Sequence, residues 1–590
     1  MIDRRKLVTG GASSLMLGQM ITGAPVAWAQ GNLFPSPVKQ SALKAIVQIG
    51  GRRLVYDSAL GRDMGPYIGE FVKQHCVLVT LPDFPLTVFF RPDVNSDRVE
   101  VVVELGRMWG HGPDDQPSHI VAPYTVEIVR GEKTLATVDV PYHWWWSRWR
   151  WQSEPRPLVR SVTSLMARKL LPPLGRVPLI NSEPHIRPLA YSGPMDRVSL
   201  LFDGSTGERA EIGPVTEAQA DYIINGSDAA LRTMLAQAEA CGSAPIHWRD
   251  EKTGTFINMQ QYPTAATNVF SGHPIIPRPP KPKTDAGKDD PRYMDVETSH
   301  TPALAYVPYL LTDDPYLLEE QQALGTLAMG FTGQDRGTYK LPGLVTVNQT
   351  RGFAWSIRSL FQLGVMQPAQ LPSWLLPTNY WKKCVADNLV FMHAFMNSPA
   401  KVNRVFHQFP MVGEVGPWQN CFISFILAWA LQMGYSEWRE AYDWHLQGII
   451  PFVDGKSGWN RQYPTPYFMW LFNEWPNRER KLIADQSLDS ITLDNWLAAW
   501  EFFKAHSKID DVQWDGHTIM DTASGPAYLF YLYGVLKMAS SLGHPEAKLP
   551  LEWLETEIPR APHYPNAAEV RGFAKWSVTS KPIELEPSRP

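Results

Sequence analysis

The hydrophobic pattern of the chain changes near residue 213. Before this point, short β-rich segments alternate with turns, and YTVEIVRGEKTLATVDV (124–140) has apolar residues at every second position on both sides of a turn. That pattern is typical of a β-hairpin, and several such strands at close spacing predict an antiparallel β-sandwich. We therefore expect a β-sandwich domain over residues 30–212, in which 161–172 is the one helix.

After residue 213, helical segments recur in pairs. An apolar helix comes first and a more amphipathic one follows, as in residues 416–434 and 436–453. By the same pattern, DPYLLEEQQALGTLAMG (314–330) is the amphipathic member of its pair and is expected to have a polar face. A barrel of helical hairpins requires this alternation, because its inner helices are enclosed and its outer helices face solvent.

Five or six such hairpins over residues 213–560 predict an (α/α) toroid, with residues 561–590 as a C-terminal tail. The alternative is a helical solenoid, but no strict repeat is present and the connections are long and uneven. The sequence thus predicts an α+β protein of two domains, with a β-sandwich followed by a toroid that carries the active site.

Residues 1–29 have the layout of an export signal. Arg4–Lys6 are basic, Leu7–Val26 are moderately apolar, and Ala27–Ala29 form a small-x-small cleavage site. The adjacent arginines resemble a twin-arginine signal. We therefore expect a periplasmic or extracellular protein that begins near Gln30, and no other apolar run is long enough to anchor it stably in a membrane.

The composition excludes some classes of protein and leaves others open. The net charge of −4 gives no electrostatic footprint for nucleic acid. The four cysteines show no metal-ligand spacing, and motifs for metal or organic cofactors are missing, so we expect no cofactor. The 23 tryptophans, 21 tyrosines and 24 phenylalanines fit either a ligand site that stacks on rings or large aromatic cores.

A β-domain followed by an aromatic-rich set of helical hairpins resembles the six-hairpin glycosidase superfamily and the toroid-fold polysaccharide lyases. The resemblance is architectural, covers roughly residues 40–560 and carries over no catalytic motif. It implies an enzyme that cleaves glycosidic bonds of a polysaccharide or oligosaccharide. Because fold alone does not determine function, the site has to be argued from the residues.

Ligands of a helical toroid bind at its wide end, where the inner helices begin, so the helix starts supply the candidate residues. The first start, DVETSHTP (295–302), places Glu297 and His300 at the rim, and Tyr306 and Tyr309 follow along the helix. The second start places Arg351 and Trp355 one turn apart on one helix face. For the acids, helix capping is the alternative role.

Glu414 lies between two glycines ahead of the third helix start, which carries the candidate substrate-binding residues Trp418, Gln419 and Asn420. A carboxyl group desolvated against tryptophan has a raised pKa and becomes a good general acid. Asp521 precedes the fourth helix start. Trp248, in the loop HWRDEKTG (247–254), is a further candidate for binding sugar hydroxyls.

These residues support two chemistries. An inverting hydrolase needs two carboxyl groups about 6.5–9.5 Å apart, and Glu414 as acid with Asp295, Glu297 or Asp521 as base fits that need. A lyase acting on a uronate-containing glycan needs a cation and a base, which Arg351 and His300 supply, with Tyr306 or Tyr309 as a second proton carrier. The plentiful acids favour hydrolysis, and a non-catalytic glycan-binding protein is a third possibility.

The stretch YHWWWSRWRWQ (142–152) is read as the strand that leaves the hairpin. Side chains in a strand alternate between two faces. Trp145, Trp149 and Trp151 are predicted on one face, and Trp144, Trp146, Arg148 and Arg150 on the other. We expect a plate between the two domains, with indoles toward the helices and arginines bonded to acids or carbonyls, although a carbohydrate platform is the alternative.

Overall fold

The computed structural model describes most of the chain between residues 42 and 579. The described ranges are 42–82, 84–106, 123–180, 186–196, 210–250, 252–267, 282–294, 296–331, 334–347, 349–397, 403–407, 414–467, 469–471, 496–507, 527–560 and 574–579. The predicted export signal at residues 1–29 lies outside them, and so does Asp521.

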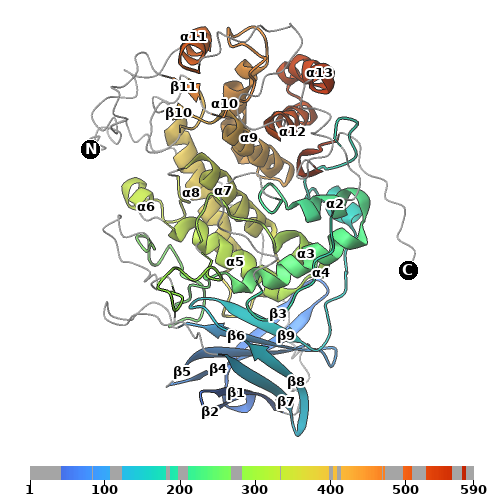
Figure 1. Ribbon diagram of the computed structural model, residues 1–590, viewed down its shortest axis with the longest axis vertical. Helices are drawn as coiled ribbons and strands as arrows, with labels where there is room; N and C mark the ends of the chain where they lie inside the picture. The colour runs from blue at the N-terminus through green and yellow to red at the C-terminus, as the bar shows by residue number, and fades with distance from the viewer. Residues whose placement is uncertain are drawn as a thin grey trace, which may run out of the picture.

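The N-terminal part folds into two antiparallel sheets (Figure 1), with strand orders β2-β1-β7-β8 and β3-β4-β5-β6-β9. The strands are β1 (Leu43–Ile49), β2 (Arg52–Asp57), β3 (Arg62–Ile68), β4 (Lys73–Leu81), β5 (Phe84–Pro92), β6 (Val99–Leu105), β7 (Tyr124–Arg130), β8 (Lys133–Val140) and β9 (Arg148–Gln152). The predicted hairpin is confirmed, because β7 and β8 pair with Arg130 opposite Lys133. Helix α1 (Val162–Ala167) begins after the cap Ser161.

The later part is helical, so the chain is a mixed α+β protein as predicted. Its helices are α2 (Glu217–Asn225), α3 (Asp228–Ala240), α4 (Tyr306–Thr312), α5 (Pro315–Gly330), α6 (Gln334–Tyr339), α7 (Thr350–Val365), α8 (Thr378–Met396), α9 (Pro417–Gln432), α10 (Arg439–Ile449), α11 (Trp496–Ser507), α12 (Ala527–Ser541) and α13 (Lys548–Glu557). Thr216 caps α2 with a full capping box formed with Gln219. Gly226 then ends α2 in the left-handed region, where glycine has no steric penalty.

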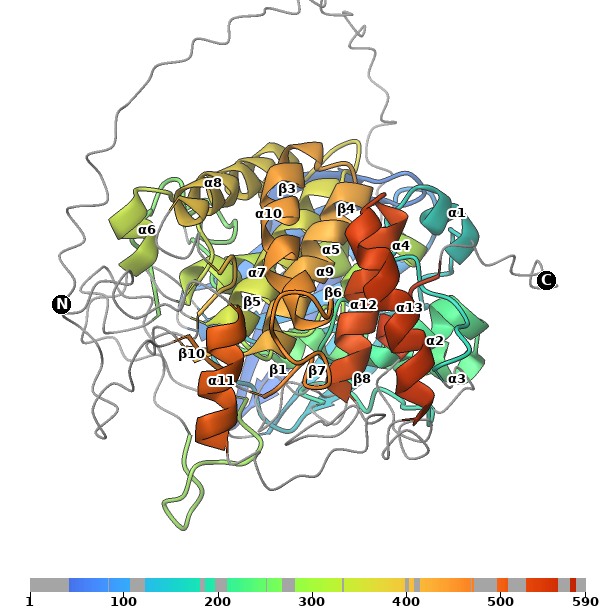
Figure 2. The ribbon, with the colours of Figure 1, turned by 90° about the horizontal axis from the view of Figure 1, so that it is seen from above.

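Helices α7 and α9 are buried along nearly their whole length, whereas α8 and α10 bury one face. Helix α7 packs against α5 and α9, and α9 packs against α12 and α10. Figure 2 shows α9 between α10 and α12. The pattern of enclosed and half-exposed helices therefore follows the sequence for these pairs.

Helix α5 differs from its prediction. The amphipathic pattern predicts a polar face in contact with solvent, but Glu319, Glu320 and the two following glutamines are all buried. The reason is the five-stranded sheet, whose face toward the helices carries charges that neutralise the two glutamates. A polar face on a helix can contact another polar face as well as water.

The sheet face that meets α5 is built from alternate residues of β5, β6 and β9. All of β6 (VEVVVEL) is buried, and Glu100 and Glu104 lie on one face because successive side chains alternate. The register places Glu104 opposite Arg148 and Val102 opposite Arg150. Arginine and glutamate side chains therefore share one buried face of the sheet.

Glu319 of α5 is at the centre of the buried charges. Arg91 Nη2 and Arg148 Nη1 each lie 2.6 Å from Glu319 Oε2, and Arg249 hydrogen-bonds the other oxygen. Burial alone would raise the pKa of Glu319, but Arg148, Arg91 and Arg249 together hold it well below its usual range. The glutamate is therefore ionised and neutralised from three directions.

Further ion pairs extend this network on both sides of Glu319. Arg148 Nε lies 2.6 Å from Glu320 Oε1, and His247 Nε2 lies 3.0 Å from Glu320 Oε2. Arg150 Nη1 lies 3.0 Å from Glu100 Oε2 and 2.6 Å from an oxygen of Asp314, the N-cap of α5. The sheet and α5 are thus joined by buried charges at several points.

The tryptophan–arginine stretch is only partly a strand. Trp146 has a φ of 63°, so the chain turns there and the strand begins at Arg148. Within β9, Trp149 donates from Nε1 to the Tyr124 hydroxyl of the other sheet at 3.1 Å. The expectation that arginines bond acids at the domain boundary is confirmed, but Trp149 faces the second sheet and not the helices.

Three further features concern the cysteines, the length of the helices and the end of the chain. All four cysteines are buried and unpaired. No helix in the described part of the chain is long and apolar enough to cross a membrane. Residues 574–579, within the segment predicted as a tail, are packed inside, and Trp576 stacks on Phe422 at 5.4 Å.

We predict that Glu319→Gln destabilises the junction of sheet and helices by about 3–5 kcal/mol, because it leaves buried arginines without their shared counter-charge. The effect is measured as a lower melting temperature in calorimetry and as faster proteolysis between the two parts. Glu440→Gln is the control, since the Glu440 side chain is 76% exposed. Equal effects of the two substitutions would contradict the assignment.

The same network predicts a loss of stability in acid. Despite burial, which would raise them, Arg148 and His247 lower the pKa of Glu320 from 4.5 to about 2, and Arg150 and neighbouring arginines lower that of Asp314 from 3.8 to about 2. Groups with a lower pKa in the folded state stabilise it at higher pH. The melting temperature should therefore fall as the pH drops from about 4.5 toward 2, and a constant value would contradict this.

Candidate functional site

Three side chains predicted from two different helix starts meet in the structure. Glu297 and His300 belong to the turn 297–301 ahead of α4, and Arg351 lies in the first turn of α7. A Glu297 carboxylate oxygen hydrogen-bonds His300 Nδ1, and Arg351 Nη1 lies 3.3 Å from His300 Nε2. We call these three residues the His300 cluster.

The hydrogen bonds define the proton positions on His300. Arginine can only donate, so Nε2 accepts from Arg351 and carries the lone pair of the neutral ring. The proton is then on Nδ1, which donates to Glu297. A carboxylate that orients a histidine in this way leaves Nε2 as the basic atom.

Glu297 is held as a carboxylate. Burial raises its pKa, but the hydrogen bonds from His300 and from the backbone N–H of Ser299 lower it, and the net pKa is below the usual value. The Ser299 N–H donates to Glu297 Oε2 at 2.6 Å. Glu297 is therefore suited to orient His300 and is a poor proton donor at neutral pH.

The cluster is partly open to solvent. The His300 and Glu297 side chains are 13% and 31% exposed, and Arg351 is half-buried. A substrate group can therefore approach, while the surrounding protein strengthens the electrostatic interactions.

Trp418, at the start of α9, lies beneath Arg351. The Arg351 guanidinium carbon is 5.5 Å from the Trp418 ring centre, a cation–π distance. Tyr528 stacks on Trp418 at 4.9 Å, and Trp418 Nε1 donates to the carbonyl of Tyr467. Trp418 is only 1% exposed, so it supports Arg351 and has little surface for a sugar ring.

Tyr467 is an aromatic residue near the cluster that the pattern of helix starts does not predict as a binding residue. It is 40% exposed and lies 5.6 Å from Trp418 with an interplanar angle of 30°. Its segment, NRQYPTPYFMW, reads as a loop with no helix start. Only the fold brings this loop next to α9.

Several predicted substrate-binding residues lie elsewhere. The Tyr306 hydroxyl donates to the carbonyl of Leu170, and the Tyr309 hydroxyl hydrogen-bonds Tyr67 of the sheet. Both rings are buried at the junction with the N-terminal part. They do not join the His300 cluster, because Tyr309 faces Tyr67 of the sheet and Tyr306 packs edge-on against Trp429 of α9 at 6.0 Å.

Other candidates are packed into the interior. Trp355 is fully buried and contacts Phe422 at 4.7 Å. Asn420 bonds the backbone of Phe406 and the imidazole of His445, Gln419 is buried beside it, and Trp248 is buried against Trp146. These side chains act in packing within the described structure.

The three other acids of the hydrolase hypothesis have no described side chains. The backbone of Glu414 forms the short strand β10 (Glu414–Val415), paired with β11 (Met469–Trp470), so it is not in a loop as predicted. Asp295 and Asp521 lie outside the described residues. Among those residues, no three His, Cys, Asp or Glu side chains gather as they would around a metal ion.

No protein-family model matches the chain, and neither a curated protein nor a solved structure matches it. The His300 cluster therefore has to be interpreted from its own chemistry.

We predict that neutral His300 carries its proton on Nδ1. Nitrogen-15 NMR of labelled imidazoles reports the tautomer, and His300→Asn identifies the signal. In Glu297→Ala the acceptor is lost, so the proton should shift toward Nε2, the commoner tautomer. A proton found on Nε2 in the unchanged protein would contradict the geometry.

Proposed function

We propose that the chain is an exported carbohydrate-active enzyme and that the His300 cluster is its active site. Its helical pairs would close into an (α/α) toroid, as in the superfamilies that the chain resembles. The reaction that the cluster supports best is β-elimination on a uronate-containing glycan. The observation that carries this proposal is the contact between a carboxylate-oriented histidine and an arginine.

The chemistry follows from the atoms that meet. A uronate carboxylate would bind Arg351, whose charge stabilises the negative charge that develops on that carboxylate. Because Arg351 then turns to the substrate, the lone pair on His300 Nε2 becomes free. Nε2 takes the C5 proton, a double bond forms between C4 and C5, and the C4–O bond breaks. The same proton can pass from Nε2 to the departing oxygen.

The residues that position these groups have separate roles in this proposal. Glu297 holds the Nδ1 proton and stabilises the imidazolium that forms when Nε2 is protonated. Trp418 supports Arg351 from below. Tyr467 presents an exposed ring on which a sugar could stack.

Hydrolysis is the second candidate, and one observation favours it. The backbone of Glu414 lies in β10, three residues before the first residue of α9, which carries Trp418. In that reaction Glu414 would be the acid, and Glu297, whose lowered pKa keeps it ionised, would be the base. The two reactions give different products, so they are separable.

The test is a screen of the mature protein against uronate-containing and neutral polysaccharides, reading both ultraviolet absorbance and new reducing ends. Elimination creates a conjugated, absorbing uronyl group, whereas hydrolysis adds only a reducing end. His300→Gln should lower the turnover rate by about 10²–10⁴-fold, and Arg351→Met should abolish turnover of the uronate glycan. His393→Gln is the control, because that histidine is 48% exposed.

Other outcomes decide between the alternatives. New reducing ends without absorbance, together with loss of activity in Glu414→Gln, would support the hydrolase and overturn elimination. Binding of a glycan that is never cleaved would favour a non-catalytic binding protein. Full activity of His300→Gln would remove the His300 cluster as the active site.

A further inference from the structure

Arg358 is a buried cation whose hydrogen bonds, among the described residues, go to backbone carbonyls. It lies in α7 and is fully buried. Its Nη2 donates to the carbonyl of Thr301 at 2.8 Å, and its Nη1 donates to the carbonyl of Gly213. Its guanidinium carbon is 5.1 Å from the centre of the Trp355 ring. Within the described part of the chain, no carboxylate forms an ion pair with it.

Three buried arginines of the five-stranded sheet differ from Arg358. Arg91, Arg148 and Arg150 each contact at least two carboxylates. A buried charge that is bonded only to neutral carbonyls is costly, and burial lowers the pKa of Arg358 to about 9. A costly arrangement is expected where it serves a function.

The two carbonyls show what Arg358 holds in place. Thr301 directly follows His300, and its hydroxyl donates to the carbonyls of Glu297 and Thr298 at 2.9 and 3.0 Å. The turn 297–301 is thus closed on itself, and Arg358 fixes its last residue to α7. Gly213 lies at the start of the helical part, so the same side chain joins that point to the turn.

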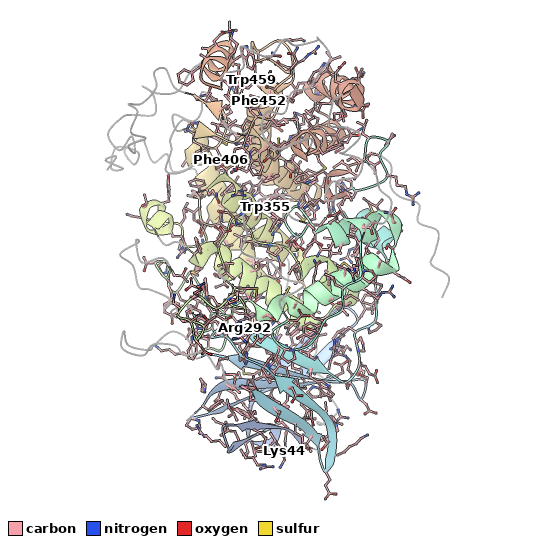
Figure 3. The ribbon with its side chains drawn as sticks, in the orientation of Figure 1. Lys44, Arg292, Trp355, Phe406, Phe452 and Trp459 are labelled. Carbon is pink, nitrogen blue, oxygen red and sulfur yellow. The ribbon has the colours of Figure 1, made fainter. Side chains whose placement is uncertain are left out.

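Helix α7 also carries the cation of the cluster. Arg351 and Arg358 are seven residues apart, which is two turns or about 10 Å along the helix. Between them, Gly352 lets the turn approach closely, because a Cβ there would lie 3.0 Å from Thr298 Oγ1. Figure 3 shows Trp355, which Arg358 contacts, in the interior of the helical part.

We propose that Arg358 is a positioning residue of the His300 cluster, an inference that rests on the proposed function. By holding the carbonyl of Thr301, it fixes the turn 297–301 on α7, so that His300 Nε2 and Arg351 face one substrate together. Helix α7 carries both Arg351 and Arg358. Because Arg358 holds the turn that carries His300, the distance between His300 and Arg351 is fixed.

The test compares Arg358→Met, Arg358→Lys and Arg148→Met in the full-length protein. Three quantities are measured: the melting temperature, the nitrogen-15 signals of the His300 imidazole, and the kcat and KM on any glycan that is cleaved. In Arg358→Met the turn is released, so the imidazole should lose its fixed Nδ1–H tautomer. The kcat should fall on the order of 10²-fold, with a smaller change in KM.

The control variants separate positioning from stability. Arg148→Met breaks the buried network, so it should lower the melting temperature and leave the His300 signals unchanged. Arg358→Lys keeps the charge and can reach one carbonyl, so its His300 signals and kcat should lie between those of Arg358→Met and the unchanged protein. If Arg358→Met does not fold, Arg358→Lys and Arg358→Gln are compared in the same way.

A folded Arg358 variant with unchanged His300 signals would overturn the proposal. The NMR measurement needs no substrate, so it also separates the two hypotheses. If the His300 signals change but the unchanged protein cleaves no glycan, Arg358 still positions His300 and the proposed function fails.

Discussion

The carboxylate of Glu319, bound by three arginines, is the interaction on which the arrangement of the two parts depends. The arginines come from β5, from β9 and from the loop after α3, so one side chain joins three separate segments. Desolvating these charges is costly, and only the full set of partners offsets that cost. A buried network of this kind gives one relative position of sheet and helix, because any other position leaves charges unpaired.

Packing between helices links the candidate site to the position of α5 on the sheet. Helix α5 is fixed on the sheet, α7 packs against α5, and α9 packs against α7. Arg351 at the start of α7 and Trp418 at the start of α9 therefore meet at the same end of the bundle. The His300 turn is held against α7 by Arg358. The helices that carry the site are thus placed relative to the sheet through α5, although the site lies far along the chain from the sheet.

Much of the local structure could be predicted from the sequence. Period-two segments predicted the β7–β8 hairpin, the pattern over 161–172 predicted α1, and apolar helices such as α9 are enclosed as expected. The helix starts also indicated His300, Glu297 and Arg351 as candidates, and the structure brings these three into contact. These predictions succeed because each depends on neighbouring residues and on periodicity.

Other features could not be predicted in this way. Tyr306 and Tyr309 follow His300 in sequence and lie on α4, yet their partners, Leu170 and Tyr67, are set by tertiary packing. The acids of α5 read as a solvent face, but they meet arginines far away in sequence, as in the pair of Glu320 and Arg148, which are 172 residues apart. Tyr467 lies in a loop whose position depends on α9.

By itself, the sequence determined the strands, the helices and their caps, and the positions of the charged residues along them, because these follow from backbone geometry and the alternation of apolar residues. Only the tertiary structure decided which charges are buried together and which aromatic rings are exposed. The physical reason is that a long-range ion pair has no local signature: Arg148 has the same strand position whether it faces water or Glu319. The acid that pairs with Arg148 is determined by how the sheet packs against α5.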